Sequence, residues 1–135
     1  MKKLRVLIVD DVAADVEATA AILRREGHEV LSTNDGGKSQ KIADIEQPDV
    51  ILMDLVMPGV NGFQATRELG RSASTMHIPV IVVSRKDEEI DRVWARKQGA
   101  KAYLAKGFSE AELFVALASV TQDAQAQSET GEHQG

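Results

Sequence analysis

Short runs of strand-forming, mostly apolar residues alternate along this chain with segments of helical character, and this alternation constrains the fold most. The expected strands span residues 4–9, 29–33, 50–54, 78–83 and 102–105. The expected helices span residues 12–26, 38–46, 62–69 and 86–98, and a last one begins at residue 109. Alternating strands and helices predict a parallel sheet with helices on both faces and right-handed crossovers. We therefore expect an α/β protein, with a doubly wound sheet of five parallel strands and five helices.

Two of the expected helices have weak or unusual patterns. In residues 38–46 only Ile42, Ala43 and Ile45 are apolar, so the first turn has nothing to bury and the helix is expected to be short or mobile. The charged helix over 86–98 offers Ile90, Val93 and Trp94 as its large apolar residues. A tryptophan at helical spacing is more typical of packing than of a binding surface.

The totals describe one soluble domain and exclude several function classes. The chain has 135 residues, enough for a single core, and residues 1–120 form the expected domain. Residues 121–135 are rich in Gln, Ser, Glu and Gly and are predicted to be a disordered polar tail. A net charge of −5 disfavours binding to nucleic acid or anionic membranes, and the lack of cysteine excludes thiolate chemistry. With no signal peptide and no membrane-spanning run, we expect a cytoplasmic protein that does not insert into membranes.

Polar residues that can bind a metal or take part in a reaction stand where the expected strands end. Asp10 and Asp11 follow the first strand, Asp54 ends the third, Ser84 follows the fourth and Lys106 follows the fifth. In a parallel sheet these ends share one edge, which is where ligands bind. Three clustered carboxylates repel one another unless a cation is present, and Mg²⁺ prefers such oxygen ligands. A carboxylate can also act as a nucleophile and form an aspartyl-phosphate, with a lysine and a hydroxyl binding the phosphoryl oxygens.

At these residues the chain resembles the receiver domain of bacterial two-component response regulators. The resemblance runs from about residue 3 to 120, and rests on the segments 7–11 and 52–62 together with Ser84, Tyr103 and Lys106. It implies a flavodoxin-like sheet of strand order 2-1-3-4-5, the order already known for a chemotaxis receiver of this family.

The resemblance also implies a magnesium-dependent reaction. Asp54 corresponds to the phosphoacceptor, which takes its phosphoryl group from a sensor histidine kinase or a phosphotransfer domain. Asp11 corresponds to the direct Mg²⁺ ligand, and Asp10 acts largely through metal-bound water. Asp54 and the backbone carbonyl of Val56 complete the implied metal ligands. Such a domain catalyses only its own phosphorylation and dephosphorylation and is not otherwise an enzyme.

Three further residues correspond to the parts that read the phosphoryl group. Lys106 matches the lysine of the family, Ser84 the switch hydroxyl, and Tyr103 the aromatic that turns inward with it. Taken alone, Ser84 is an ordinary strand-end serine and Tyr103 a half-buried strand aromatic. The chain departs from the family at Gly107, where proline and a cis peptide are usual, so this loop is expected to be trans or more flexible. Arg85 stands where a small residue is common, and we expect it to affect phosphoryl loss.

Residues 57–67 and 93–100 are similar to single-domain receivers of type IV pilus, twitching-motility systems. The predicted function is a stand-alone response regulator, monomeric or weakly dimeric, that switches the binding of an unidentified downstream protein in motility or chemotaxis-like signalling. One alternative is a phosphorylation-independent interaction module, which Gly107 alone favours. Another is a small aspartyl-phosphate hydrolase, against which the short loops argue.

Overall fold

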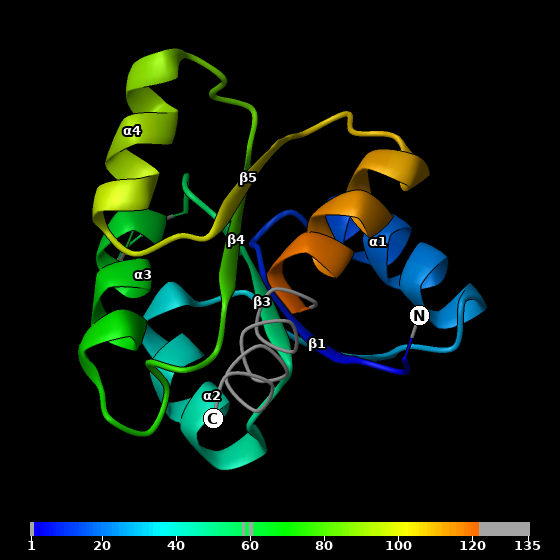
Figure 1. The fold of residues 1–135 in the computed structure, drawn as a ribbon, viewed down its shortest axis with the longest axis horizontal. Coiled ribbons are helices and arrows are strands. Elements are labelled where there is room, and N and C mark those ends of the chain that lie inside the picture. The colour runs from blue at the N-terminus through cyan, green and yellow to red at the C-terminus, as the bar shows by residue number, and fades with distance from the viewer. Residues whose placement is uncertain (1, 58, 60, 122–135) are drawn as a thin grey trace, which may run out of the picture.

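The strands form one parallel sheet in the order β2-β1-β3-β4-β5 (Figure 1). The computed structural model describes residues 2–57, 59 and 61–121. The strands are β1 (Arg5–Val9), β2 (Glu29–Thr33), β3 (Val50–Asp54), β4 (Val80–Ser84) and β5 (Ala102–Ala105). Each neighbouring pair is parallel. The predicted flavodoxin-like order is therefore confirmed.

Helices cover both faces of this sheet (Figure 1). They are α1 (Ala13–Arg25), α2 (Ser39–Glu46), α3 (Gly62–Arg71), α4 (Glu89–Lys97) and the helical residues 110–121, besides the 3-10 turn η1 (Gly36–Lys38). Helix α1 and residues 110–121 lie on one face, and α2, α3 and α4 lie on the other. Within the described residues no helix is long and apolar enough to cross a bilayer.

The central strand β3 is buried along its whole length, and its alternate residues enter two different cores. Leu52 packs with Leu23 of α1 and Leu117 of the last helical segment on one face. Met53 packs with Leu69 of α3 on the opposite face. A strand covered on both sides has no solvent face, which explains its unbroken apolar run.

Helix α2 is short, as predicted, but the expectation that its first turn buries nothing is wrong. The helix has eight residues, and Ser39 at its start is 1% exposed. The Ser39 hydroxyl donates a hydrogen bond of 2.7 Å to the Gly36 carbonyl, so the preceding 3-10 turn satisfies this polar group inside the protein. Ile45, one of the three apolar residues of the pattern, is instead 67% exposed.

Helix α4 begins at Glu89, three residues later than predicted. Glu88 and Asp91 form a reciprocal capping box there, which fixes the start and leaves residues 86–88 as a loop. Of this helix only Ala95 is buried, whereas Trp94 is 49% exposed and lies under the Lys97 ammonium.

Other predicted boundaries shift by one or two residues, and β4, for example, begins at Val80 rather than at residue 78. Helix α3 extends two residues beyond the predicted end at Leu69. Thr121 is helical, so the predicted tail begins one residue too early, and the rest of it, residues 122–135, lies outside the described residues.

Candidate functional site

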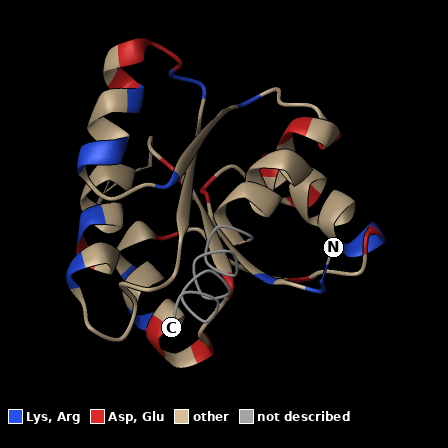
Figure 2. Cartoon of the chain, viewed as in Figure 1, with Lys and Arg blue, Asp and Glu red and all other residues tan. Residues whose placement is uncertain are grey.

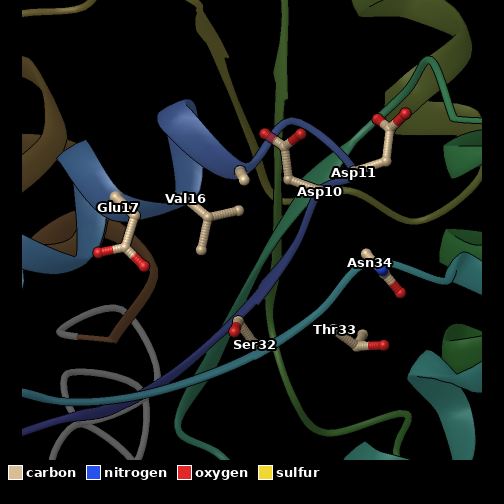
Figure 3. A pocket seen from close by; sticks show the side chains of 8 residues that line it. Asp10, Asp11, Val16, Glu17, Ser32, Thr33 and Asn34 are labelled. Carbon is tan, nitrogen blue, oxygen red and sulfur yellow. The ribbon is translucent and has the colours of Figure 1, made fainter.

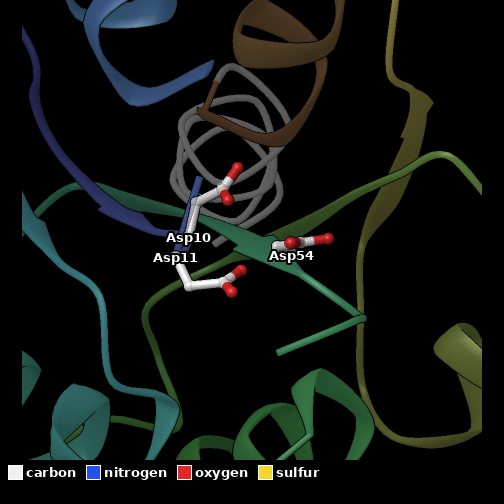
Figure 4. Close-up of side chains that lie close together, drawn as sticks. All are labelled: Asp10, Asp11 and Asp54. Atoms are coloured by element: carbon white, nitrogen blue, oxygen red, sulfur yellow. The ribbon is translucent and has the colours of Figure 1, made fainter. Parts of the chain in front are cut away.

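The ends of β1 and β3 bring three carboxylates together at the carboxyl edge of the sheet (Figure 4). Ligand oxygens of Asp10, Asp11 and Asp54 all lie within 4.8 Å of one another. Asp10 and Asp54 are buried, whereas Asp11 is exposed. The site therefore has a buried inner pair of acids and one outer acid that faces solvent.

The strand register places these acids at one level. Val9 pairs with Met53 in the parallel ladder between β1 and β3, so the residues that follow them, Asp10 and Asp54, emerge side by side. The Val12 backbone N–H donates a 2.9 Å hydrogen bond to the Asp10 carboxylate, which orients it at the entry to α1. The Val56 N–H does the same for Asp54, at 3.3 Å.

Lys106 lies among the carboxylates, and its side chain is only 9% exposed. Its Nζ atom is 3.0 Å from Asp10 Oδ2 and 3.6 Å from Asp54 Oδ2. Burial lowers the pKa of this ammonium, but its hydrogen bond to Asp15, its ion pair with Asp10 and the charge of Asp54 outweigh burial, so the pKa lies above its ordinary value. Lys106 is therefore a fixed positive charge at neutral pH.

Asp15 is a member of this cluster that the sequence reasoning missed. Its Oδ2 atom is 2.8 Å from Lys106 Nζ and 3.3 Å from an Arg85 guanidinium nitrogen. The hydrogen bond from Lys106 lowers the pKa of Asp15 despite partial burial. The only sequence signal was an acid in the first turn of α1, which an ordinary helix-dipole preference also explains.

The surroundings of Asp54 disfavour its charged form. Burial, followed by the charge of Asp10, raises its pKa above the ordinary carboxyl value, while Lys106 and the Val56 N–H oppose that rise only in part. The three clustered carboxylates also carry more negative charge than the one Lys106 ammonium beside them can balance. A divalent cation with oxygen ligands would complete this balance.

Ser84 and Tyr103 meet at the backbone of one residue, Lys86. The buried Ser84 hydroxyl accepts a 3.1 Å hydrogen bond from the Lys86 N–H. The Tyr103 hydroxyl donates to the Lys86 carbonyl on the other side of that residue. The Tyr103 ring is partly buried and packs under the Arg92 guanidinium, at 4.8 Å from its centroid.

The loop after β5 has no cis peptide, and none occurs among the described residues. The Lys106–Gly107 bond is therefore trans, one of the two outcomes the sequence left open. Gly107 has φ of +92°, a conformation that only glycine adopts readily. The Lys106 N–H donates a 2.8 Å bond to the Ser84 carbonyl, so this residue is anchored before the loop turns at Gly107.

A hollow of about 450 Å³ opens beside Asp10 and Asp11, between α1 and β2 (Figure 3). Val16 and Glu17 line it from α1, and Thr33 from β2. This hollow lets solvent and small ions reach Asp10 and Asp11 from outside the protein.

The donor set fits Mg²⁺, because carboxylate oxygens from Asp10, Asp11 and Asp54 converge and no nitrogen or sulfur ligand is needed. Val56 lies beside Asp54 and its side chain is exposed, and its carbonyl as a further ligand stays a prediction. Asp11 would be the most accessible of the three carboxylates.

We expect the substitution Asp11→Asn to weaken Mg²⁺ binding by at least about tenfold, because even residues behind the direct ligands often contribute that much. Isothermal titration of Mg²⁺ into the protein measures the change. Glu17→Gln is the matched control, since it removes the same charge from the rim of the neighbouring hollow. An equal loss of affinity in both variants would contradict a direct role for Asp11.

These observations define a class of protein: a doubly wound α/β domain whose strand ends gather three carboxylates, a partly buried lysine and a hydroxyl at one edge. Residues 6–118 match the family described as the response regulator receiver domain. The chain belongs to this family.

Individual relatives agree with this membership. The chain is 48% identical over 116 residues to Protein PilH of Pseudomonas aeruginosa, covering 86% of this chain and 96% of PilH. It is 37% identical to the response regulator PleD of Caulobacter vibrioides over 87% of this chain, but over only 26% of PleD. The receiver domain of a Pseudomonas aeruginosa sensor histidine kinase superposes with a TM-score of 0.82 at 30% identity, covering 90% of this chain and 99% of that one. That structure holds a magnesium ion coordinated in its active site cleft.

Proposed function

We propose that this protein is a phosphorylatable receiver that accepts a phosphoryl group on Asp54 from a phosphohistidine of a sensor kinase or phosphotransfer domain. The observation that carries the proposal is the convergence of the Asp10, Asp11 and Asp54 carboxylates within 4.8 Å, with the Lys106 ammonium beside them. This arrangement combines a nucleophile, a metal-ligand set and a fixed cation at one strand edge.

In the proposed transfer an Asp54 oxygen forms a bond to phosphorus while the bond from phosphorus to the donor's histidine nitrogen breaks. The electron pair of the broken bond stays on that nitrogen, which takes up a proton from solvent. A bound Mg²⁺ would supply charge neutralisation and a template for the phosphoryl oxygens. Lys106 lies 3.6 Å from Asp54 and is the protein cation placed to bind a phosphoryl oxygen.

The proposed output is a change in partner binding through Ser84 and Tyr103. Ser84 would turn from the Lys86 N–H toward the phosphoryl group, and Tyr103 would respond through the same backbone residue.

The proposed recipient is a downstream protein in pilus-based motility or chemotaxis-like signalling, reached by a cytoplasmic monomer or weak dimer. Similarity to PilH supports this setting. Figure 2 shows acidic and basic residues on the helices, and the net charge of −5 favours a protein partner over nucleic acid.

The test is to incubate the protein with acetyl phosphate and Mg²⁺ and to measure its intact mass. We expect one phosphoryl adduct, which is absent when EDTA removes the metal. Several adducts, or one that forms equally well in EDTA, would contradict the proposal. Complete failure to form an adduct under any condition would favour the alternative, a phosphorylation-independent interaction module.

A further inference from the structure

We propose that Asp15 is a positioning residue that keeps the Lys106 ammonium at the site when Mg²⁺ is bound. This inference rests on the proposed function, because it assigns Lys106 to the phosphoryl group. Asp15 lies on α1 and its side chain is 30% exposed, so it faces the site from its outer rim. It would act only through Lys106 and would not touch the phosphoryl group itself.

The contacts of Lys106 indicate which acid holds it. The Asp15 contact, at 2.8 Å, is shorter than the contacts with Asp10, at 3.0 Å, and with Asp54, at 3.6 Å. An ammonium group has three donors, and Asp15 takes one of them with good hydrogen-bond geometry. The lysine is therefore bound most closely by an acid outside the three-carboxylate cluster.

Metal binding would affect the contacts of Lys106 with Asp10 and Asp54 but not its contact with Asp15. Asp10 and Asp54 belong to the cluster whose oxygens lie close enough to share one ion, and Asp15 does not. A divalent cation would neutralise part of the charge on Asp10 and Asp54 and weaken their attraction for Lys106. Asp15 would keep its full charge and hold the ammonium in reach of Asp54.

The backbone beside Lys106 gives a reason for a side-chain anchor. Gly107 follows it directly, is exposed and adopts a positive φ, so the chain after Lys106 has neither the rigidity of proline nor a buried side chain. The first fixed points beyond it are partly buried Phe108 and the cap of the last helix at Ser109. The Ser84 carbonyl holds the Lys106 backbone, and the ion pair to α1 restricts the lysine side chain, which the loop after it does not support.

Arg85 is a second cation in contact with Asp15. Its guanidinium is 3.3 Å from Asp15 Oδ2, the oxygen that also binds Lys106, and its own side chain is 68% exposed. Because Lys106 contacts Asp15 directly, replacing Arg85 leaves that contact in place. This difference between the two partners of Asp15 provides a matched control.

The test records the ¹H–¹⁵N signal of the Lys106 ammonium, assigned by its loss in Lys106→Arg, with Mg²⁺ as the only added ligand. We expect a visible signal in the parent and in Arg85→Ala. In Asp15→Asn the signal should disappear on addition of Mg²⁺ because the ammonium then exchanges freely with water, and Asp15→Glu should restore it. Phosphorylation by acetyl phosphate at saturating Mg²⁺ should be about three- to tenfold slower in Asp15→Asn, the size of one net hydrogen bond.

A double substitution separates action through Lys106 from a general effect. Asp15→Asn should slow phosphorylation in the parent but have no further effect in a Lys106→Met background. Equal slowing in both backgrounds, or an unchanged Lys106 signal in Asp15→Asn with Mg²⁺, would overturn the inference. Faster phosphorylation of Asp15→Asn would also overturn it, because Asp15 would then withhold the lysine. If the parent takes up no phosphoryl group, the proposed function fails, while the ammonium signal still decides whether Asp15 positions Lys106.

Discussion

Replacing Gly62 by alanine is expected to destabilise the protein by about 3 kcal/mol or more, at the upper end of overpacking effects. A Cβ atom at this position would lie 2.1 Å from the Asp54 carbonyl oxygen and 2.6 Å from Leu55 Cα. Both are backbone atoms, so no side-chain rotation can relieve the contact. The first turn of α3 would have to move away and lose the 3.0 Å hydrogen bond from the Gly62 N–H to the Leu55 carbonyl.

Urea unfolding measures this loss, and Gly70→Ala is its control in the same helix. The nearest atom to a Cβ at Gly70 is the Gln98 carbonyl oxygen, at an ordinary contact distance of 3.9 Å. Alanine favours the helix by about 1 kcal/mol over glycine, so Gly70→Ala should stabilise the protein slightly. Similar changes in the two variants would mean that the tight approach of α3 to Asp54 is not what Gly62 provides.

Asp54→Asn is expected to have opposite effects on function and on stability. The variant should take up no phosphoryl group from acetyl phosphate, because an amide cannot act as the carboxylate nucleophile. The same variant should be more stable than the parent without metal, with a rise in Tm of about 2–6 °C for a gain near 1 kcal/mol. The gain follows from removing a buried charge that lies beside Asp10, while Lys106 keeps its contacts with Asp10 and Asp15.

The pH dependence of that gain has a definite sign. Burial and Asp10 raise the pKa of Asp54, so the folded protein holds this proton more tightly than the unfolded chain does. The stability associated with Asp54 is therefore present below the ordinary carboxyl pKa and is lost as pH rises through the raised pKa. The advantage of Asp54→Asn should appear at neutral pH and fade in acid, and Mg²⁺ should stabilise the parent more than the variant.

Thermal unfolding from pH 4 to 8, with and without Mg²⁺, measures these differences. Asp44→Asn removes an exposed acid from α2 and serves as the control. A Tm of Asp54→Asn at or below that of the parent at neutral pH without metal would contradict the electrostatic argument. Retention of the phosphoryl adduct in this variant would place the phosphoacceptor elsewhere.

Much of the fold could be predicted because this sheet has both faces buried. A short, unbroken apolar run such as β3, bounded by turn residues, favours a buried strand, and the helices between strands then favour parallel pairing. The convergence of Asp10, Asp54 and Lys106 followed from strand ends alone.

The missed features have two causes, a long-range contact at Asp15 and local hydrogen bonds at Glu88 and Ser39. Asp15 pairs with Lys106, which is 91 residues away, so nothing near Asp15 indicates its partner. The start of α4 is fixed by a capping box at Glu88, whereas the helical composition of the sequence already begins at Lys86. The burial of Ser39 was not expected because the sequence around Gly36 predicts only a turn. In the structure Gly36 begins a 3-10 turn, and its carbonyl accepts the Ser39 hydroxyl.

The meeting of Ser84 and Tyr103 at Lys86 has a thermodynamic consequence. If Ser84 turns to a phosphoryl oxygen, it exchanges one hydrogen bond for another, so the free-energy difference between the two arrangements is of the order of one net bond, about 1 kcal/mol. A balance this close is shifted by any partner that prefers one arrangement, and by reciprocity such a partner also changes the tendency of Asp54 to hold its phosphoryl group. Binding of the target would then change the lifetime of the phosphoryl group on Asp54 through the backbone of Lys86.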